Sequence, residues 1–216
     1  MEIKIMRNVL DKNQDKADDI RQLLKQNQVV MFNFISSPGA GKTSLLELLC
    51  ENLAPEYNIG IIEGDAYTDR DARRLIKYNL PIIQINTEGG CHLDSNSISG
   101  ALAEFDLNKL DVVFVENVGN LICPTAFDLG ENYCIALTST TEGDDKPTKY
   151  PMLFRKADSI ILNKIDLIPY TNFNINSFKA DLQKLGVNIP LFEISCMQQA
   201  GINNVLDWFK VIIESK

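Results

Sequence analysis

The sequence lacks the features that mark membrane, secreted and nucleic-acid-binding proteins. No apolar run approaches the roughly 18–20 residues of a membrane span. Residues 1–7 lack the apolar core of a signal peptide. Lys and Arg total 21 against 29 Asp and Glu, a net charge of -8, and they form no basic cluster of the kind that binds nucleic acid. We therefore expect a cytoplasmic protein with no nucleic-acid and no membrane partner.

Cysteine and histidine are scarce as well. The five cysteines are odd in number and form no Cys-x-x-Cys pair, so a disulfide framework is not expected. Cys50, on a predicted helix, and Cys134, in a predicted strand, are expected in the core. The single histidine, His92, directly follows Cys91.

The most informative segment is residues 36–43, which read Ser-Ser-Pro-Gly-Ala-Gly-Lys-Thr. It follows an apolar run, residues 29–35, and opens into a leucine-rich helix predicted over 44–53. A strand, a loop of small residues ending in Gly-Lys-Thr and a helix are the arrangement of a P-loop. One departure is Ser36, which stands where the first glycine usually lies. An ordinary glycine turn is the alternative, and the flanking strand and helix argue against it.

We expect this loop to bind nucleotide phosphates through its backbone N–H groups and the N-terminus of the helix. Lys42 is expected to reach the β- and γ-phosphates, and the Thr43 hydroxyl to bind Mg²⁺. The predicted phosphate-binding residues are Pro38, Gly39, Ala40, Gly41, Lys42, Thr43 and Ser44.

Short β-rich runs alternate with helical segments along the chain. Strands are also expected at 59–62, 81–85, 112–115, 134–138, 159–162 and 191–194, and helices at 14–28, 69–77, 95–105, 176–185 and 202–213. This alternation predicts an α/β fold, a single P-loop NTPase domain with a mostly parallel central sheet and helices on both faces. We assign residues 29–216 to that domain and residues 1–28 to an N-terminal helical extension packed on it. The charged, proline-marked residues 142–151 are expected to form a loop.

Residues 163–166, Asn-Lys-Ile-Asp, follow a predicted strand and favour GTP over ATP. The Asp166 carboxylate can accept hydrogen bonds from guanine N1–H and the exocyclic amine, and adenine offers no such donor pair. Asn163 is expected to brace the loop and Lys164 to lie over the base. Ser195 is expected to contact the base as well. A strand-end turn is the alternative, since Asn and Asp are common in turns.

Carboxylates for Mg²⁺ are expected at the ends of two predicted strands, from Asp65 and Glu116, together with Thr43. Residues 116–119, Glu-Asn-Val-Gly, are similar to the Asp-x-x-Gly switch element of GTPases, so Gly119 is expected to offer its N–H to the γ-phosphate. Asn120 stands where many regulatory GTPases have a water-orienting Gln, which predicts slow hydrolysis of GTP to GDP and phosphate. The predicted catalytic residues are Lys42, Thr43, Asp65, Glu116 and Gly119.

Cys91, His92 and Cys123 are candidate metal ligands, because thiolate and imidazole suit Ni, Zn and Cu. Adjacent residues rarely bind one metal comfortably within one chain, so we expect a site shared across a two-fold dimer axis. Cys123 lies four residues beyond Gly119, so movement of that loop with the γ-phosphate would move a metal ligand. The alternative is that the Cys91-His92 pair is a partly buried structural feature.

Together these residues resemble the hydrogenase nickel-incorporation GTPase (HypB) family, one of the nickel-handling P-loop GTPases that also include the urease accessory GTPase. The matching runs are residues 36–43, 63–65, 90–94, 116–124, 142–147, 149–151 and 163–166. The urease accessory GTPase carries Cys-Pro-His where this chain has Cys91 and His92 in direct sequence, which favours the hydrogenase branch.

The resemblance implies a GTP-hydrolysing nickel metallochaperone that assists nickel insertion during maturation of nickel–iron hydrogenase. It implies GTP, Mg²⁺ and Ni²⁺ (or Zn²⁺), with Cys91, His92 and Cys123 holding the transition metal at the interface of a homodimer formed in the GTP state. It also implies that Lys149 approaches the nucleotide bound by the partner subunit. The expected partners are a HypA-type zinc/nickel protein and, as client, the hydrogenase large subunit.

Other functions stay open on the residues alone. A regulatory or assembly GTPase with a structural metal site would show equal metal affinity with GTP and GDP. A urease-type nickel accessory GTPase would differ in its client. A P-loop phosphotransferase would transfer phosphate to an acceptor other than water, and residues 163–166 argue against it.

Overall fold

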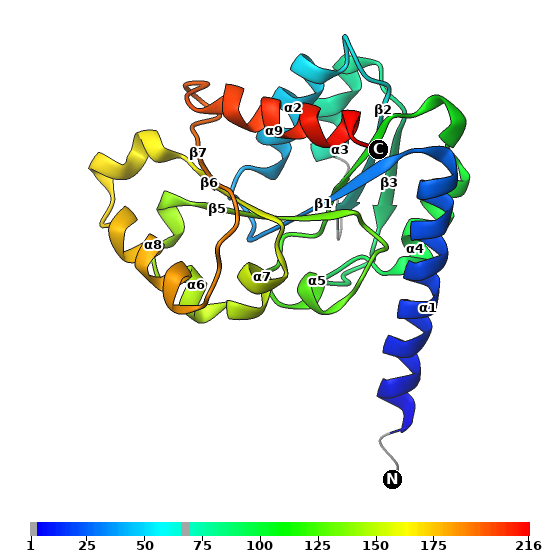
Figure 1. Cartoon of the computed structure of the whole chain (residues 1–216), viewed down its shortest axis with the longest axis horizontal. Coiled ribbons are helices and arrows are strands. Elements are labelled where there is room, and N and C mark those ends of the chain that lie inside the picture. The colour runs from blue at the N-terminus through cyan, green and yellow to red at the C-terminus, as the bar shows by residue number, and fades with distance from the viewer. Residues whose placement is uncertain (1–3, 66–69) are drawn as a thin grey trace.

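A parallel β-sheet runs through the part of the chain that the structure, a computed structural model, describes: residues 4–65 and 70–216 (Figure 1). Seven strands in these residues pair in the order β3-β2-β4-β1-β5-β6-β7, and every neighbouring pair is parallel. They are β1 (Val30–Ser36), β2 (Ile59–Asp65), β3 (Ile82–Asn86), β4 (Val112–Glu116), β5 (Tyr133–Ser139), β6 (Ser159–Asn163) and β7 (Leu191–Glu193). The predicted α/β fold is confirmed.

β1 lies in the middle of the sheet, paired with β4 on one side and β5 on the other. Its side chains alternate between the two faces, as the two-residue period of a strand requires. Phe32 and Phe34 belong to one core cluster, and Met31 and Ile35 belong to two clusters on the other face. Because the P-loop sequence follows β1, it emerges at the carboxyl edge of the sheet, where such sheets bind ligands.

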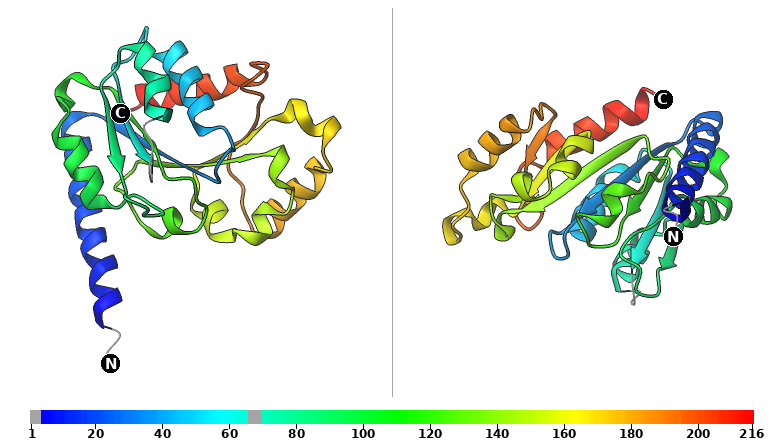
Figure 2. Two further views of the ribbon diagram at one scale, coloured as in Figure 1. Left: turned by 180° about the vertical axis from the view of Figure 1, so that it is seen from behind. Right: turned by 90° about the horizontal axis from the view of Figure 1, so that it is seen from below.

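Helices cover both faces of the sheet, as predicted (Figure 2). One core cluster joins β1 to α2 (Lys42–Leu53) and α9 (Ile202–Glu214). The opposite face packs against α1 (Lys4–Asn27), α4 (Ser95–Ala103), α7 (Pro151–Lys156) and α8 (Ile175–Lys184). The shorter helices are α3 (Arg70–Leu75), α5 (Cys123–Ala126) and α6 (Lys146–Lys149). Among the described residues, no helix is both long and apolar enough to cross a membrane.

α1 is longer than the helix predicted over 14–28, and its N-terminal half reaches beyond the sheet (Figure 1). Its C-terminal half is anchored by buried Ile20 and Leu24. The Asn13 side chain adds polar anchors, because its amide donates to the Asp128 carbonyl oxygen at 2.8 Å and its oxygen accepts from Ser95 N at 2.9 Å. The division of the chain at residue 28 stays a prediction.

The segment 142–151 is not the loop that its charge and prolines predicted. A 3-10 turn (Thr140–Glu142), α6 and α7 occupy it and its flanks. Pro151 is the first residue of α7, and proline at a helix start is favourable because its fixed φ suits the first turn. The prolines therefore begin helices here.

The helix predicted over 69–77 also differs, since α3 ends at Leu75 and a 3-10 turn (Ile76–Tyr78) follows. Its predicted first residue lies outside the described residues. The other strands and helices after residue 28 lie where they were predicted, with ends that differ by a few residues.

Candidate functional site

The loop between β1 and α2 has the backbone that its glycines permit. Gly41 precedes the first residue of α2 with φ of 103°, in the left-handed region that favours glycine. A Cβ atom at Gly41 would also clash with the Asn163 amide nitrogen. Gly119 comes close to the loop from the switch segment, where a Cβ would lie 3.1 Å from Pro38 Cα. The lack of a side chain at Gly41 thus leaves room for the Asn163 amide. The lack of one at Gly119 lets the backbone there lie close to Pro38.

Lys42 is buried, and its ammonium group donates to Ser36 Oγ at 2.9 Å. Burial lowers the pKa of Lys42, although the nearby Glu116 carboxylate opposes the shift. Ser36, which departs from the usual P-loop glycine, thus supplies a hydrogen-bond acceptor for the lysine. Phosphate oxygens would be stronger acceptors, because a bond between two charged groups is stronger than one to a neutral hydroxyl.

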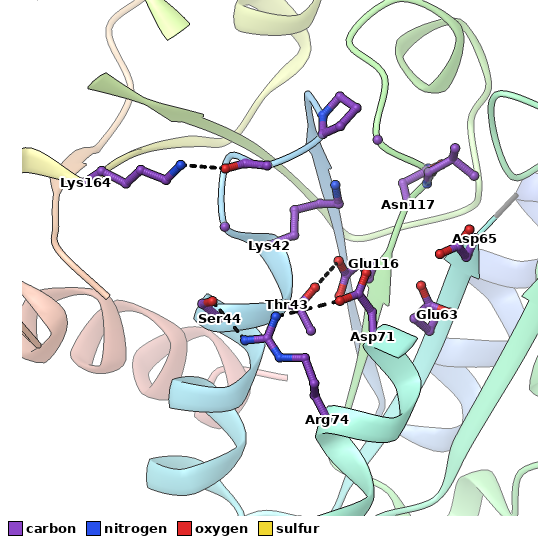
Figure 3. A pocket seen from close by; sticks show the side chains of 16 residues that line it. Lys42, Thr43, Ser44, Glu63, Asp65, Asp71, Arg74, Glu116, Asn117 and Lys164 are labelled. Atoms are coloured by element: carbon purple, nitrogen blue, oxygen red, sulfur yellow. Dashed lines mark hydrogen bonds and ion pairs between the residues drawn. The ribbon is translucent and has the colours of Figure 1, made fainter. Parts of the chain in front are cut away.

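Two buried carboxylates, Glu116 and Glu63, line the same cavity as Thr43 (Figure 3). The Thr43 hydroxyl donates to Glu116 Oε1 at 2.9 Å. Glu116 Oε2 and Glu63 Oε2 are buried without a hydrogen-bond partner among the described residues. Burial raises the pKa of Glu116 to about 7 and that of Glu63 to about 8. Buried carboxylate oxygens without partners are unfavourable, and a bound cation would satisfy them.

Glu63 was not predicted as a site residue, and neither were Asp71 and Arg74 of α3. Carboxylate oxygens of Glu63, Asp65 and Asp71 all lie within 4.8 Å of one another. Arg74 donates to Ser44 Oγ at 3.0 Å and pairs with Glu47, so α3 is bound to the start of α2. Asp71 and Arg74 stand three residues apart on one helix face, but only the fold brings that face to the P-loop.

These groups surround a cavity of about 630 Å³ in front of the P-loop. The predicted residues that line it are Pro38, Gly39, Gly41, Lys42, Thr43, Ser44, Asp65, Glu116, Gly119 and Lys164. Asn120, predicted near the attacking water, turns elsewhere: its amide donates to the Cys91 carbonyl oxygen at 3.4 Å, and its oxygen accepts from Ile122 N at 2.9 Å.

Asn163 and Lys164 connect the end of β6 to the P-loop. The Asn163 amide donates to the Ala40 carbonyl oxygen at 3.0 Å, and its oxygen accepts from Lys164 N at 2.8 Å and Cys196 N at 3.1 Å. The Lys164 ammonium donates to the Gly39 carbonyl oxygen at 2.7 Å (Figure 3). Asn163 therefore braces two loops at once.

A second cavity of about 480 Å³ adjoins the first and shares Gly41, Ser44 and Lys164 with it. Asp166 lines this cavity, and its buried Oδ1 has no hydrogen-bond partner among the described residues. Ser195 does not line it. The Ser195 side chain is buried and accepts from Gln198 N at 3.1 Å, which shapes the loop. Its neighbour Cys196 lines the cavity, and the contact of Ser195 with the base stays a prediction.

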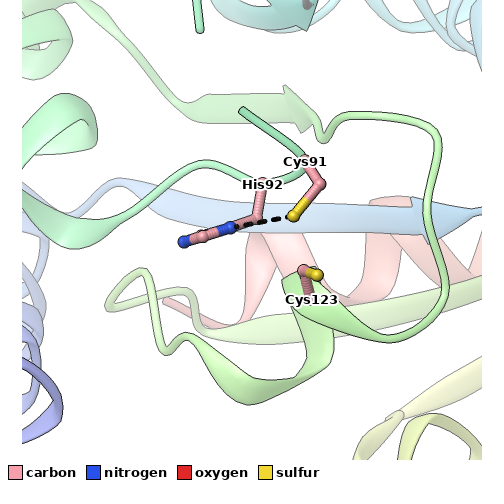
Figure 4. Close-up of side chains that lie close together, drawn as sticks. All are labelled: Cys91, His92 and Cys123. Atoms are coloured by element: carbon pink, nitrogen blue, oxygen red, sulfur yellow. Dashed lines mark hydrogen bonds between the residues drawn. The ribbon is translucent and has the colours of Figure 1, made fainter. Parts of the chain in front are cut away.

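Cys91, His92 and Cys123 meet within one chain (Figure 4). One potential ligand atom from each lies within 4.8 Å of the others, and Cys91 Sγ is 3.6 Å from His92 Nδ1. The three side chains therefore come together without a second chain, and the sharing of the site across a dimer axis stays a prediction. The start of α5 brings Cys123 to the pair, and the hydrogen bond that the Cys91 thiol donates to the Cys123 side chain raises the pKa of Cys91.

Phe127 lies against this cluster, and Lys149 lines a separate pocket with Ile122 and Thr125. The His92 ring stacks on the Phe127 ring with centroids 3.8 Å apart and an interplanar angle of 26°, which restricts the imidazole. Lys149 pairs with Asp145 at 2.6 Å and does not line the nucleotide cavity of its own chain. The stack on Phe127 could not be predicted, because no sequence pattern relates residues 92 and 127.

The fold and the cavity define a P-loop nucleotide-binding protein. Comparison with known proteins identifies the family within this class. The family model described as "CobW/HypB/UreG, nucleotide-binding domain" matches residues 30–193, and the chain belongs to this family.

The chain is similar to the hydrogenase maturation factor HypB of Escherichia coli K12, at 40% identity over 97% of this chain and 72% of that one. It is similar to the hydrogenase/urease maturation factor HypB of Helicobacter hepaticus, at 41% identity over 96% and 87%. A crystal structure of HypB from Helicobacter pylori in complex with nickel superposes with a TM-score of 0.88 at 36% identity, covering 94% of this chain and 96% of that one.

Proposed function

We propose that this chain is a GTP-hydrolysing nickel metallochaperone that assists nickel insertion during maturation of nickel–iron hydrogenase. One observation carries the proposal: the segment 116–123 lines the cavity in front of the P-loop at Glu116 and Gly119 and provides the Cys123 thiol of the thiol–imidazole cluster, which consists of Cys91, His92 and Cys123. Nucleotide state and metal binding therefore involve the same short stretch of backbone. The similarity to HypB maturation factors supports hydrogenase as the client.

In this proposal GTP occupies the two adjoining cavities. The triphosphate would lie against the loop of residues 38–44, with Lys42 on the β- and γ-phosphates. The base would lie in the second cavity, where Asp166 Oδ1 is a buried acceptor that has no hydrogen-bond partner in the described part of the chain. Guanine supplies the two donors that satisfy a carboxylate there, whereas adenine leaves it unpaired. Lys164 lines both cavities and would extend over the base.

Hydrolysis requires a cation, and the residues present fit Mg²⁺. Thr43, Glu116 and Asp65 would hold it, and one carboxylate oxygen each of Glu116 and Glu63 has no hydrogen-bond partner among the residues that the structure describes, which supports a cation in this acidic region. When bound, Mg²⁺ supplies positive charge that stabilises the phosphate oxygens during hydrolysis. Gly119 would donate its N–H to the γ-phosphate. Because Asn120 is committed to the Cys91 carbonyl oxygen and Ile122 N, it does not orient a water, and intrinsic hydrolysis is slow.

Nickel is the cargo of the cluster formed by Cys91, His92 and Cys123, with Zn²⁺ as a competitor for the same soft ligands. Three protein ligands leave coordination positions for water or for ligands from a second chain. A homodimer is supported by the surface beside the cluster, where Ile122 and Met152 are 67% and 69% exposed. In such a dimer, formed with GTP, Lys149 would reach the partner's nucleotide.

A HypA-type zinc/nickel protein and the hydrogenase large subunit complete the proposed delivery route in the cytoplasm. Urease is a second candidate client, because the relative from Helicobacter hepaticus is named a hydrogenase/urease maturation factor. Pull-down of the two apo-enzymes with the nickel-loaded protein would separate the clients.

The test is a nickel titration of the purified protein with Mg²⁺ and either a non-hydrolysable GTP analogue or GDP. We expect different nickel affinities in the two states and a loss of tight binding in Cys91→Ala and Cys123→Ala. Cys134→Ala is the matched control, because Cys134 is a buried thiol in β5 outside the cluster. Unchanged nickel binding in the first two variants would refute the metal site. Equal affinity in both states would leave a GTPase with a structural metal site.

A further inference from the structure

Asn117 lies between the nucleotide cavity and the thiol–imidazole cluster, and its side chain is fully buried. Its Oδ1 accepts two main-chain hydrogen bonds, from Val118 N at 2.9 Å and from Leu93 N at 3.2 Å. Val118 precedes Gly119 of the switch segment, and Leu93 follows the metal ligand His92. One oxygen atom therefore connects the two functional loops.

The Asn117 side chain is held in this orientation from behind. Its Nδ2 donates to Asn33 Oδ1 at 3.1 Å, and the Asn33 amide donates to Glu131 Oε1 at 3.3 Å. Glu131 in turn pairs with Lys156 of α7 at 3.2 Å. Asn33 lies in β1, the strand that leads into the P-loop. Because every member of this buried network has a partner, the network fixes one rotamer of Asn117.

Leu93 is fixed at its other end as well. Its side chain packs directly on Gly64, so closely that a Cβ there would lie 2.8 Å from Leu93 Cδ1. Gly64 separates the carboxylates Glu63 and Asp65 of the proposed cation site. The loop that carries His92 is therefore in contact with both strand ends, β2 through this packing and β4 through Asn117.

The switch segment contacts the same loop at a second point, where the Asn120 amide donates to the Cys91 carbonyl oxygen at 3.4 Å. Residues 117–120 thus hold residues 91–93 by two asparagine side chains. Residues 117–120 are therefore connected to all three cluster residues. They contact the loop of Cys91 and His92 through these hydrogen bonds, and they lead directly along the chain to Cys123.

We propose that Asn117 is a positioning residue that couples nucleotide state to metal affinity. Its shared oxygen makes the position of His92 depend on the position of Gly119. This inference rests on the proposed function. If Gly119 moves toward a γ-phosphate, Val118 N moves with it, and the shared oxygen cannot keep both bonds at their present length. Leaving Leu93 N buried and unpaired is unfavourable, so the loop of residues 91–93 must follow.

The first test compares nickel dissociation constants with a GTP analogue and with GDP, in the wild type and in Asn117→Ala. We expect a wild-type ratio within the range of about 5- to 150-fold that is common for coupled sites. In Asn117→Ala the ratio falls to within about twofold of one, because the shared acceptor is lost. Asn132→Ala is the control, since this asparagine also accepts from a main-chain N–H, that of Met31, but at the opposite end of β1.

The outcomes are distinguishable. A wild-type ratio of one overturns both the proposed function and the role of Asn117. A wild-type ratio that survives in Asn117→Ala overturns only the role of Asn117. The thiolate-to-nickel charge-transfer absorption adds a spectroscopic readout: we expect it to differ between nucleotide states in the wild type and in Asn132→Ala, and to be the same in both states in Asn117→Ala.

Amide hydrogen exchange of the metal-free wild type gives a test that needs no variant. We expect the exchange of Leu93 N–H to differ between the GTP-analogue and GDP states, together with that of Val118 N–H. Identical exchange at Leu93 in the two states would overturn the proposal even if Asn117→Ala fails to fold.

Discussion

The ammonium group of Lys42 donates to the hydroxyl oxygen of Ser36 at 2.9 Å, across the loop that would hold the phosphates. Most P-loops have glycine at the position of Ser36. The serine gives the buried lysine an acceptor in the same space that a nucleotide would enter. Phosphate binding therefore exchanges a neutral acceptor for a charged one, which favours the bound state.

Lys42→Ala should weaken GTP binding strongly, whereas Ser36→Gly should not. A hydrogen bond to a charged group contributes about 1.5–3 kcal/mol, which corresponds to a loss of about 12- to 140-fold in affinity for Lys42→Ala. Ser36→Gly restores the usual P-loop residue, and we expect GTP affinity within about threefold of the wild type. Isothermal titration with GTP and Mg²⁺ measures both. Equal effects of the two substitutions would contradict this assignment.

Asp166→Asn should exchange guanine preference for xanthine preference. The buried Oδ1 of Asp166 accepts from guanine in the proposed complex, and the asparagine amide would instead donate to the oxygen that xanthine carries in place of the amine. We expect GTP affinity to fall by about 10-fold or more, with a gain for xanthosine triphosphate. Competition binding of GTP and xanthosine triphosphate to the wild type and to Asp166→Asn measures this change in preference. Asp158→Asn, directly before β6, is the control, and a loss of GTP binding in this variant would indicate misfolding.

Stability of the nucleotide-free, cation-free protein should fall as the pH rises from about 5 to about 8. Burial raises the pKa of Glu63 to about 8 and that of Glu116 to about 7. The folded state therefore binds more protons than the unfolded state between the ordinary pKa of Glu, about 4.3, and these values, so the free energy of unfolding decreases across this interval.

Glu63→Gln removes one of the two titrating groups, so it should flatten this slope and raise Tm at the upper end of the pH range. Thermal melts at several pH values measure the effect, and Glu104→Gln, an exposed carboxylate at the end of α4, is the control. A slope that Glu63→Gln leaves unchanged would show that this carboxylate does not titrate in the range.

Phe127→Ala should weaken nickel binding, because the stack at 3.8 Å restricts the His92 ring. An aromatic pair contributes about 0.5–1.5 kcal/mol, so we expect a loss of about 2- to 12-fold in nickel affinity. Phe127→Tyr keeps the ring and should retain the wild-type affinity. Nickel titration in the GDP state measures the variants, and equal affinities of Phe127→Ala and Phe127→Tyr would argue against a role for the stack.

The residues that could be predicted as a site are those within short motifs. The P-loop and the Asn163–Asp166 segment each follow a strand, and all strands of a parallel sheet end at one edge, so their meeting follows from local pattern and strand direction. The orientation of Ser195 does not follow from local pattern. A turn after β7 is predictable, but the Ser195 hydroxyl accepts a hydrogen bond from Gln198 N. The path of the backbone through this turn places Cys196 at the cavity.

The α/β fold, the phosphate-binding loop and the chemical types of the candidate metal ligands could be predicted from local sequence, because strand and helix periodicity and loop composition act over a few neighbouring residues. The meeting of Cys123 with Cys91 and His92 in one chain, and the sharing of one Asn117 oxygen by Val118 and Leu93, are visible only in the folded chain. These contacts join segments more than twenty residues apart. They depend on the order of strands in the sheet and on side-chain rotamers fixed by packing, which no local pattern encodes.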